Sequence, residues 1–138
     1  MTTKFAYQLY FDGASRSNPG EASYGGVIYE NKDEKLVYGK YVGVRTNNEV
    51  EYMGLLNGLK EAVKMNIKNM NVFGDSKLVI EQVKGNWKVK SDKLRPYYDE
   101  IKQLLSKNPF ENIEFEHVYR KNNKRADELA NIALDEKW

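Results

Sequence analysis

The sequence contains no cysteine and a single histidine, His117. The absence of cysteine excludes a disulfide framework, a thiolate nucleophile and a cysteine-based zinc site, and one histidine excludes a histidine-rich metal centre. A bound metal would therefore be held by oxygen ligands. No apolar run approaches the length of a membrane span, and the N-terminus leads into a strand-like pattern instead of a signal peptide. We expect a cytoplasmic protein with no membrane attachment.

A strong charge of one sign is also lacking. The 22 basic and 20 acidic residues give a formal net charge of +2, too small to indicate nucleic-acid binding by itself. With 41% hydrophobic and 30% charged residues, the chain is typical of one globular domain over residues 1–138. We expect a monomer with no obligate protein partner.

Hydrophobic periodicity predicts an α/β protein. Aromatic and apolar runs favour three strands that form an antiparallel meander, and apolar residues after Asn47 recur at helical spacing. The strands are expected at 4–12, 23–30, 35–43, 69–75 and 112–120, and the helices from 47 to near 64–69, at 76–86 up to Gly85, at 93–108 through Pro96, and at 123–138. This order predicts a mixed five-stranded sheet, three antiparallel strands and then parallel strands, flanked by helices.

Four acidic residues stand where predicted elements meet. Asp12 ends the first strand, Glu51 lies in the first turn of the central helix, Asp75 ends the fourth strand and Asp127 opens the last helix. Strand ends and the helix starts that follow them line one edge of an open sheet, so these side chains can converge. Each acid also has a structural alternative, because acids near a helix start interact with the helix dipole or cap the helix, and Asp favours turns.

The residues around these acids resemble the motifs of the type 1 ribonucleases H. The segment "YFDGASRSNPG" is similar to the family's first-strand motif, "TNNEVEY" to its helix start, "GDSKLV" to its Asp-Ser motif and "NNKRADELAN" to its closing motif. The four motifs occur in order and cover nearly the whole chain. The resemblance implies an RNase H-like fold and four metal-binding carboxylates, at Asp12, Glu51, Asp75 and Asp127. Glu49 is out of register with the motif, and we interpret it as a solvated acid.

The chemistry that the resemblance implies suits this set of acids. Hard divalent cations prefer oxygen ligands, and Mg²⁺ uses a few carboxylates together with water and substrate phosphate. Two Mg²⁺ ions roughly 4 Å apart, or Mn²⁺ in their place, can activate a water and stabilise the leaving oxygen of an in-line displacement. The implied reaction is endonucleolytic hydrolysis of the RNA strand of an RNA/DNA hybrid, leaving a 5′-phosphate and a 3′-hydroxyl. The alternative is a surface acidic cluster that binds Ca²⁺ or nothing.

Selective cleavage of RNA requires recognition of the 2′-hydroxyl, which backbone groups and amides can contact. The resemblance implies substrate contacts at Gly13, Asn18, Thr46, Asn47, Asn48 and Ser76. Gly13 permits close approach of the RNA backbone. Structural alternatives are a turn for Asn18 and a helix N-cap for Asn47 or Asn48.

A basic stretch at 84–95, "KGNWKVKSDKLR", surrounds Trp87. Such a stretch can follow a nucleic-acid backbone while the aromatic ring packs against it. A solvated loop with Trp87 in the core is the alternative. The stretch is compact, without the longer basic handle region of many family members, so we expect modest, salt-sensitive affinity for the hybrid.

Longer family members carry a histidine on a flexible loop before the last carboxylate. Here the corresponding segment is short, and His117 falls within the fifth predicted strand, which favours a structural role. Arg120 is the candidate for a catalytic cation, since a cation near the scissile phosphate can stabilise charge or help the product leave. Membership of a basic surface is the alternative for Arg120.

Two other functions remain open on the same fold. One is a non-catalytic module that binds RNA/DNA hybrids or double-stranded RNA, because fold alone does not fix function. Four mutually repelling carboxylates argue against a pure binder. The other is a transposase or junction resolvase of the wider fold, against which the asparagine-rich motifs argue.

Overall fold

A five-stranded mixed sheet organises the computed structural model, which describes residues 4–138. The elements in chain order are β1 (Tyr7–Ser15), β2 (Gly20–Glu30), β3 (Asp33–Arg45), α1 (Asn47–Lys64), β4 (Asn69–Gly74), α2 (Lys77–Lys84), α3 (Arg95–Ser106), β5 (Asn112–His117), the 3₁₀ turn η1 (Arg120–Asn122) and α4 (Lys124–Glu136). Among the described residues, no helix is both long enough and apolar enough to span a membrane.

The strand order in the sheet is β3-β2-β1-β4-β5. The pairs β1–β2 and β2–β3 are antiparallel, whereas β1–β4 and β4–β5 are parallel. This is the predicted arrangement of three antiparallel strands followed by parallel strands, and it makes β1 the central strand.

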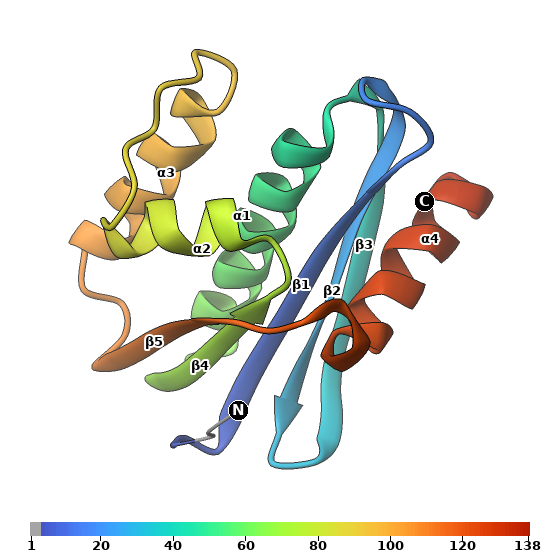
Figure 1. Cartoon of the computed structure of the whole chain (residues 1–138). Helices are drawn as coiled ribbons and strands as arrows, with labels where there is room; N and C mark the ends of the chain where they lie inside the picture. Colours follow the sequence, from blue (N-terminus) through green and yellow to red (C-terminus); the bar gives the residue numbers. More distant parts are fainter. Residues whose placement is uncertain (1–3) are drawn as a thin grey trace.

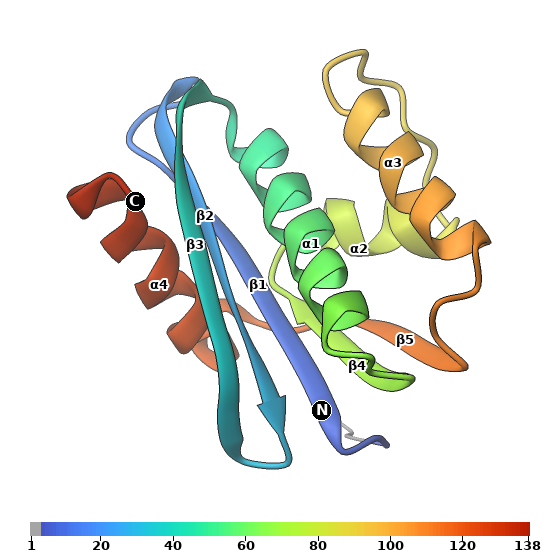
Figure 2. The same ribbon diagram turned by 180° about the vertical axis from the view of Figure 1, so that it is seen from behind.

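Helices cover both faces of the sheet, α4 on one face and α1 on the other, with α2 and α3 beside α1 (Figures 1 and 2). Successive side chains of a strand point to opposite faces. Leu9 and Phe11 are fully buried in the core that includes α1. On the opposite face Gly25, the partner of Asp12, lies so close to α4 that a Cβ there would be 2.5 Å from the nitrogen of Ala130.

Helix α1 begins one residue after its N-cap, Thr46. The Thr46 hydroxyl accepts a bond from the Glu49 N–H, and the Glu49 carboxylate accepts one from the Thr46 N–H, which forms a capping box. The proposed N-cap role of Asn47 or Asn48 is therefore wrong, and Glu49 is a half-buried capping acid instead of a solvated one. Glu51 consequently lies in the second turn, not the first.

The other boundaries follow local backbone chemistry. Helix α2 ends at Gly85, which has a left-handed φ of 88°, and α3 begins at Arg95 with Pro96 in its first turn, both as predicted. Strand β1 continues beyond the predicted end at Asp12 because its antiparallel pairing with β2 runs on to Ser15. Asp12 therefore lies inside a strand, which corrects the prediction that it ends one.

Candidate active site

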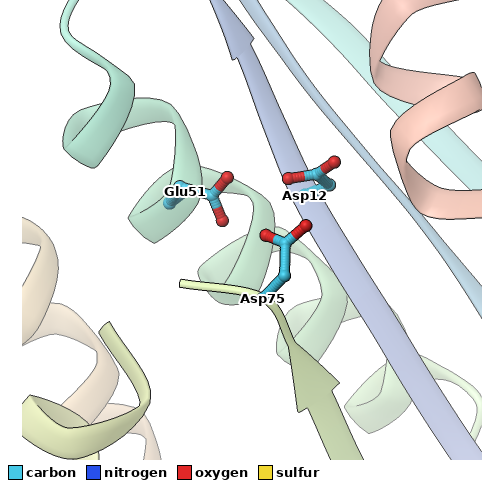
Figure 3. A group of neighbouring side chains, drawn as sticks. All are labelled: Asp12, Glu51 and Asp75. Carbon is cyan, nitrogen blue, oxygen red and sulfur yellow. The ribbon is translucent and has the colours of Figure 1, made fainter. Parts of the chain in front are cut away.

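Three carboxylates from separate elements meet at one edge of the sheet. One oxygen from each of Asp12, Glu51 and Asp75 lies within 4.8 Å of the others, and their side chains point toward one another in Figure 3. The parallel pairing of β1 with β4 ends at Phe11 and Gly74. The next residue along the chain is an aspartate in both cases, Asp12 within β1 and Asp75 just after β4, so the end of β4 beside β1 brings the two together.

Glu51 reaches the same point because α1 lies close to β1 at Gly13. The Gly13 N–H donates to Asp12 Oδ1 at 2.9 Å and to Glu51 Oε1 at 3.0 Å. A Cβ on Gly13 would lie 2.6 Å from Val50 Cγ2 and 2.8 Å from the Glu51 nitrogen, which no real Cβ tolerates. Glycine is thus required here for a close approach of helix to strand.

The alternative of helix capping is wrong for Glu51 and Asp75. Thr46 caps α1, and the Ser76 hydroxyl caps α2 by accepting from the Val79 N–H. The turn interpretation of Asp12 also fails, because Asp12 pairs with Gly25 within β1. Helix capping and turn formation therefore do not explain why these three positions are acidic.

Burial raises the pKa of each carboxyl in the cluster. Burial and, less strongly, the charge of Asp75 raise the pKa of Asp12 to about 7, against a lowering effect of its hydrogen bond with Glu51. The pKa of Glu51 lies well above its usual range because of burial and the neighbouring Asp12 charge. Burial also raises the pKa of Asp75. In the absence of cations, the cluster resists full ionisation.

The cluster has the chemistry of a site for divalent cations. Glu51 is only 8% exposed, and its Oε2 is buried with no hydrogen-bond partner among the described residues. An unpaired buried carboxylate oxygen is unfavourable, and a hard cation supplies the missing partner. The residues present therefore fit an oxygen-ligated divalent cation, whose identity the donor set does not fix.

Asp127 lies outside the close group of three but lines the same open pocket, of about 590 Å³. It stands in the first turn of α4, and its Oδ1 accepts a bond from Asn131 Nδ2 at 3.2 Å. The predicted residues that line this pocket are Asp12, Gly13, Asn47, Asn48, Glu51, Asp75, Ser76, Arg120 and Asp127.

Three predicted substrate residues do not line the pocket: Asn18, Thr46 and Trp87. Asn18 lies in the β1–β2 loop, where its Oδ1 accepts from the Asn47 N–H at 3.0 Å and so joins that loop to the start of α1. Trp87 is 44% exposed in the segment between α2 and α3. The alternative of Trp87 in the core is therefore wrong.

Of the two candidates for a catalytic cation, Arg120 and His117, only Arg120 lines the pocket. Arg120 is the first residue of η1 and is exposed, and its charge offsets part of the rise that burial causes in the pKa of Asp75. His117 is the last residue of β5 and does not line the pocket; its ring meets Tyr119 edge-on, with centroids 5.8 Å apart.

Two asparagines at this edge lie outside the residues predicted from the sequence. Asn131 follows Asp127 by one helical turn, a spacing that places both side chains on one face and could have identified it. Asn123 is buried at the start of α4 and donates from Nδ2 to the Phe11 carbonyl at 2.9 Å. Its role depends on a contact across 112 residues of sequence, which no local pattern indicates.

The sequence is similar to one family model and to curated bacterial and archaeal proteins. A family model described as "Reverse transcriptase-like" matches residues 10–133. The chain is 40% identical over 129 residues to ribonuclease HI of Halobacterium salinarum. This alignment covers 92% of this chain and 63% of that protein. It is 44% identical over 127 residues to the bifunctional protein Rv2228c of Mycobacterium tuberculosis, covering 90% of this chain. The chain spans only 34% of that mycobacterial protein.

Three solved structures share the fold closely. The RNase H1 of Halobacterium salinarum matches with a TM-score of 0.88 at 37% identity, covering 94% of this chain and 98% of that one. The N-terminal RNase H domain of Rv2228c from Mycobacterium tuberculosis, solved as a fusion with maltose-binding protein, gives 0.90 at 40%, covering 97% and 96%. LC11-RNase H1, isolated from compost and solved with an RNA/DNA hybrid, gives 0.88 at 33%, covering 94% and 97%.

The sheet order, the acidic cluster and these matches agree. The five-stranded mixed sheet with helices on both faces is the RNase H-like fold. The chain belongs to the type 1 ribonuclease H family.

Proposed function

We propose that this chain forms a single metal-dependent endoribonuclease domain that hydrolyses the RNA strand of RNA/DNA hybrids, leaving a 5′-phosphate and a 3′-hydroxyl. The observation that carries the proposal is the convergence of Asp12, Glu51 and Asp75 in an open pocket, with a buried Glu51 oxygen that has no hydrogen-bond partner within residues 4–138. The binding of an RNA/DNA hybrid by LC11-RNase H1 supports the choice of substrate.

In this proposal Asp12, Glu51, Asp75 and Asp127 hold two Mg²⁺ ions, or two Mn²⁺ ions. Such ions, when bound, would supply activation of the attacking water and stabilisation of the leaving oxygen. The chain's own residues orient the ligands: the Gly13 N–H fixes one oxygen each of Asp12 and Glu51, and Asn131 fixes one of Asp127. No side chain acts as a nucleophile.

Substrate contacts are proposed on both sides of the cluster. Asn47 and Asn48 are exposed at the start of α1, and Ser76 lies beside Asp75, so the RNA strand would lie across these residues and Gly13. The Oδ1 of Asn18 is engaged by the Asn47 N–H, which leaves the Asn18 amide N–H groups to contact a 2′-hydroxyl. Arg120 faces the same pocket and is proposed to stabilise phosphate charge.

The remaining contacts are proposed for the DNA strand. Thr46 is adjacent to the pocket-lining Asn47, and the basic stretch at 84–95 presents Trp87 to solvent. Phosphate contacts made by exposed lysines weaken with salt. Hybrid affinity is therefore expected to fall as ionic strength rises.

One assay tests this proposal against the alternative of a non-catalytic binder. Wild type, Asp75→Asn and the control Asp33→Asn, an exposed aspartate at the start of β3, are incubated with labelled RNA/DNA, RNA/RNA and DNA/DNA duplexes in Mg²⁺, Mn²⁺ or chelator. We expect metal-dependent cleavage of the hybrid RNA by wild type and Asp33→Asn only, with hybrid binding retained by Asp75→Asn. Binding without cleavage in wild type would favour the non-catalytic module, and full activity of Asp75→Asn would exclude the proposed site.

A further inference from the structure

Asn123 connects the elements that carry the acidic residues. It is 1% exposed and lies between η1 and α4. Its Nδ2 donates to the carbonyl of Phe11, the residue before Asp12, at 2.9 Å. Its own carbonyl accepts from the Asp127 N–H at 3.1 Å, and its N–H donates to the Arg120 carbonyl at 3.0 Å.

The same side chain also interacts with Asp75, and this interaction offsets part of the rise that burial causes in the pKa of that carboxyl. An amide nitrogen has two protons, and here both neighbouring groups, the Phe11 carbonyl and the Asp75 carboxylate, are acceptors. Only one amide orientation is therefore allowed, because a flip would place oxygen against oxygen. The Asn123 Oδ1 is left buried and without a partner among the described residues.

Helix stability does not account for this arrangement. Asn123 is the N-cap of α4, a position at which an asparagine side chain usually accepts a bond from the first turn. Here it makes no such bond and donates instead to the Phe11 carbonyl of β1, while its Oδ1 has no partner among the described residues. The asparagine thus forgoes the usual cap bond of its oxygen and donates to β1 instead.

We propose that Asn123 is a positioning residue. It keeps the Asp75 side chain close to Asp12, and it holds α4, which carries Asp127, next to these two aspartates. This role rests on the proposed function, because it concerns the same carboxylates. Asn123 itself touches neither substrate nor metal. Its removal should leave Asp75 free to turn away and α4 free to shift relative to β1.

The test compares Asn123→Ala with Asn71→Ala. Asn71 is a matched control: it is 5% exposed on β4, and its Oδ1 accepts from the N–H groups of Lys4 and Phe5, which precede β1 and do not line the pocket. Three quantities are measured: the thermal midpoint in chelator, Mn²⁺ affinity by calorimetry, and kcat and KM on a labelled RNA/DNA hybrid.

Both variants should lower the thermal midpoint to a similar extent. Only Asn123→Ala should weaken Mn²⁺ binding and lower kcat, by about 10- to 100-fold as is typical for residues that orient metal ligands, with KM for the hybrid within about twofold of wild type. Unchanged Mn²⁺ affinity and kcat in Asn123→Ala would overturn the proposal. So would equal losses in Asn71→Ala.

Asn123→Ser supplies a second variant if Asn123→Ala does not fold, because its hydroxyl retains one donor. Loss of the fold in both variants would assign Asn123 a purely structural role and overturn the proposal. Failure of the proposed function is distinguishable: wild type would then bind Mn²⁺ without cutting the hybrid, and the loss of Mn²⁺ affinity in Asn123→Ala would still decide the role of Asn123.

Discussion

The backbone N–H of Gly13 lies 3.0 Å from a carboxylate oxygen of Glu51, and the same N–H donates to Asp12. One amide group thus joins a strand acid to a helix acid. Two carboxylates this close repel each other when both are ionised. The shared donor offsets part of this repulsion and fixes where the two oxygens point, so Gly13 determines the geometry of the site through its backbone.

Gly13→Ala should separate α1 from β1. The new Cβ would lie 2.6 Å from Val50 Cγ2 and 2.8 Å from the Glu51 nitrogen, and the backbone cannot yield as a flexible side chain would. We expect a loss of about 1–3 kcal/mol in the free energy of unfolding, typical of overpacking, and loss of cleavage. Urea unfolding and hybrid cleavage measure the two effects; wild-type kcat in Gly13→Ala would contradict the expected role.

The metal-free protein should lose stability as pH rises from about 5 to 7. The native state retains a proton on Asp12, with its pKa of about 7, whereas the unfolded chain has released it near pH 4. Each proton held only by the native state lowers the free energy of unfolding by about 1.4 kcal/mol per pH unit as pH rises, up to the native pKa. Above about pH 7 this contribution should level off.

Urea unfolding in chelator at pH 5, 6, 7 and 8 measures how the free energy of unfolding of wild type and Asp12→Asn changes with pH. The variant cannot release that proton, so its stability should fall less steeply between pH 5 and 7. Saturating Mg²⁺ should flatten the wild-type curve, since a bound cation favours the ionised carboxylates. A difference between wild type and variant that does not change with pH would refute the assignment.

Arg120→Ala should lower kcat by about 10-fold or more while changing KM little, because loss of a charge near the reacting phosphate acts mainly on the transition state. His117→Ala should keep wild-type kcat, since His117 ends β5 and does not line the pocket. Steady-state kinetics on a hybrid compares the two variants. The opposite ranking would restore the histidine as the catalytic cation.

Trp87→Ala should weaken hybrid binding without affecting stability. The residue is 44% exposed, so we expect its removal to cost little packing, and loss of a stacking contact of ~1 kcal/mol should raise KM about fivefold. Trp138, 45% exposed at the end of the chain, provides a matched control: Trp138→Ala should leave KM unchanged. Equal KM values for the two variants and wild type would remove Trp87 from the substrate contacts.

Local patterns predicted much of the fold and none of the distances in the site. Gly85 and Pro96 placed the end of α2 and the start of α3 correctly, because each has a backbone restriction that acts within one turn. The predicted strand end at Asp12 was wrong because the length of β1 depends on its pairing with β2. A sequence pattern at Asp12 carries no record of that pairing.

The start of α1 also could not be predicted from the local sequence pattern. Both Thr46 and the asparagines after it are good N-caps by residue type, and only the reciprocal bonds of Thr46 with Glu49 decide between them. Asn123 illustrates the harder case, since its partner Phe11 belongs to a distant strand. The family resemblance supplied the acids as a set, but their convergence follows from the end of β4 at Gly74 beside β1.

The docking of α4 on β1 and β2 also affects the order in which the elements of the chain fold. The meander of β1, β2 and β3 forms from neighbouring segments, whereas the bond between Asn123 and Phe11 spans 112 residues and that between Ser23 and Ala130 spans 107. Contacts between such distant segments carry the largest loop-closure entropy and slow folding. A chain with its sheet paired but α4 undocked would hold Asp12, Glu51 and Asp75 without Asp127, so we expect the docking of α4 to complete the proposed site last.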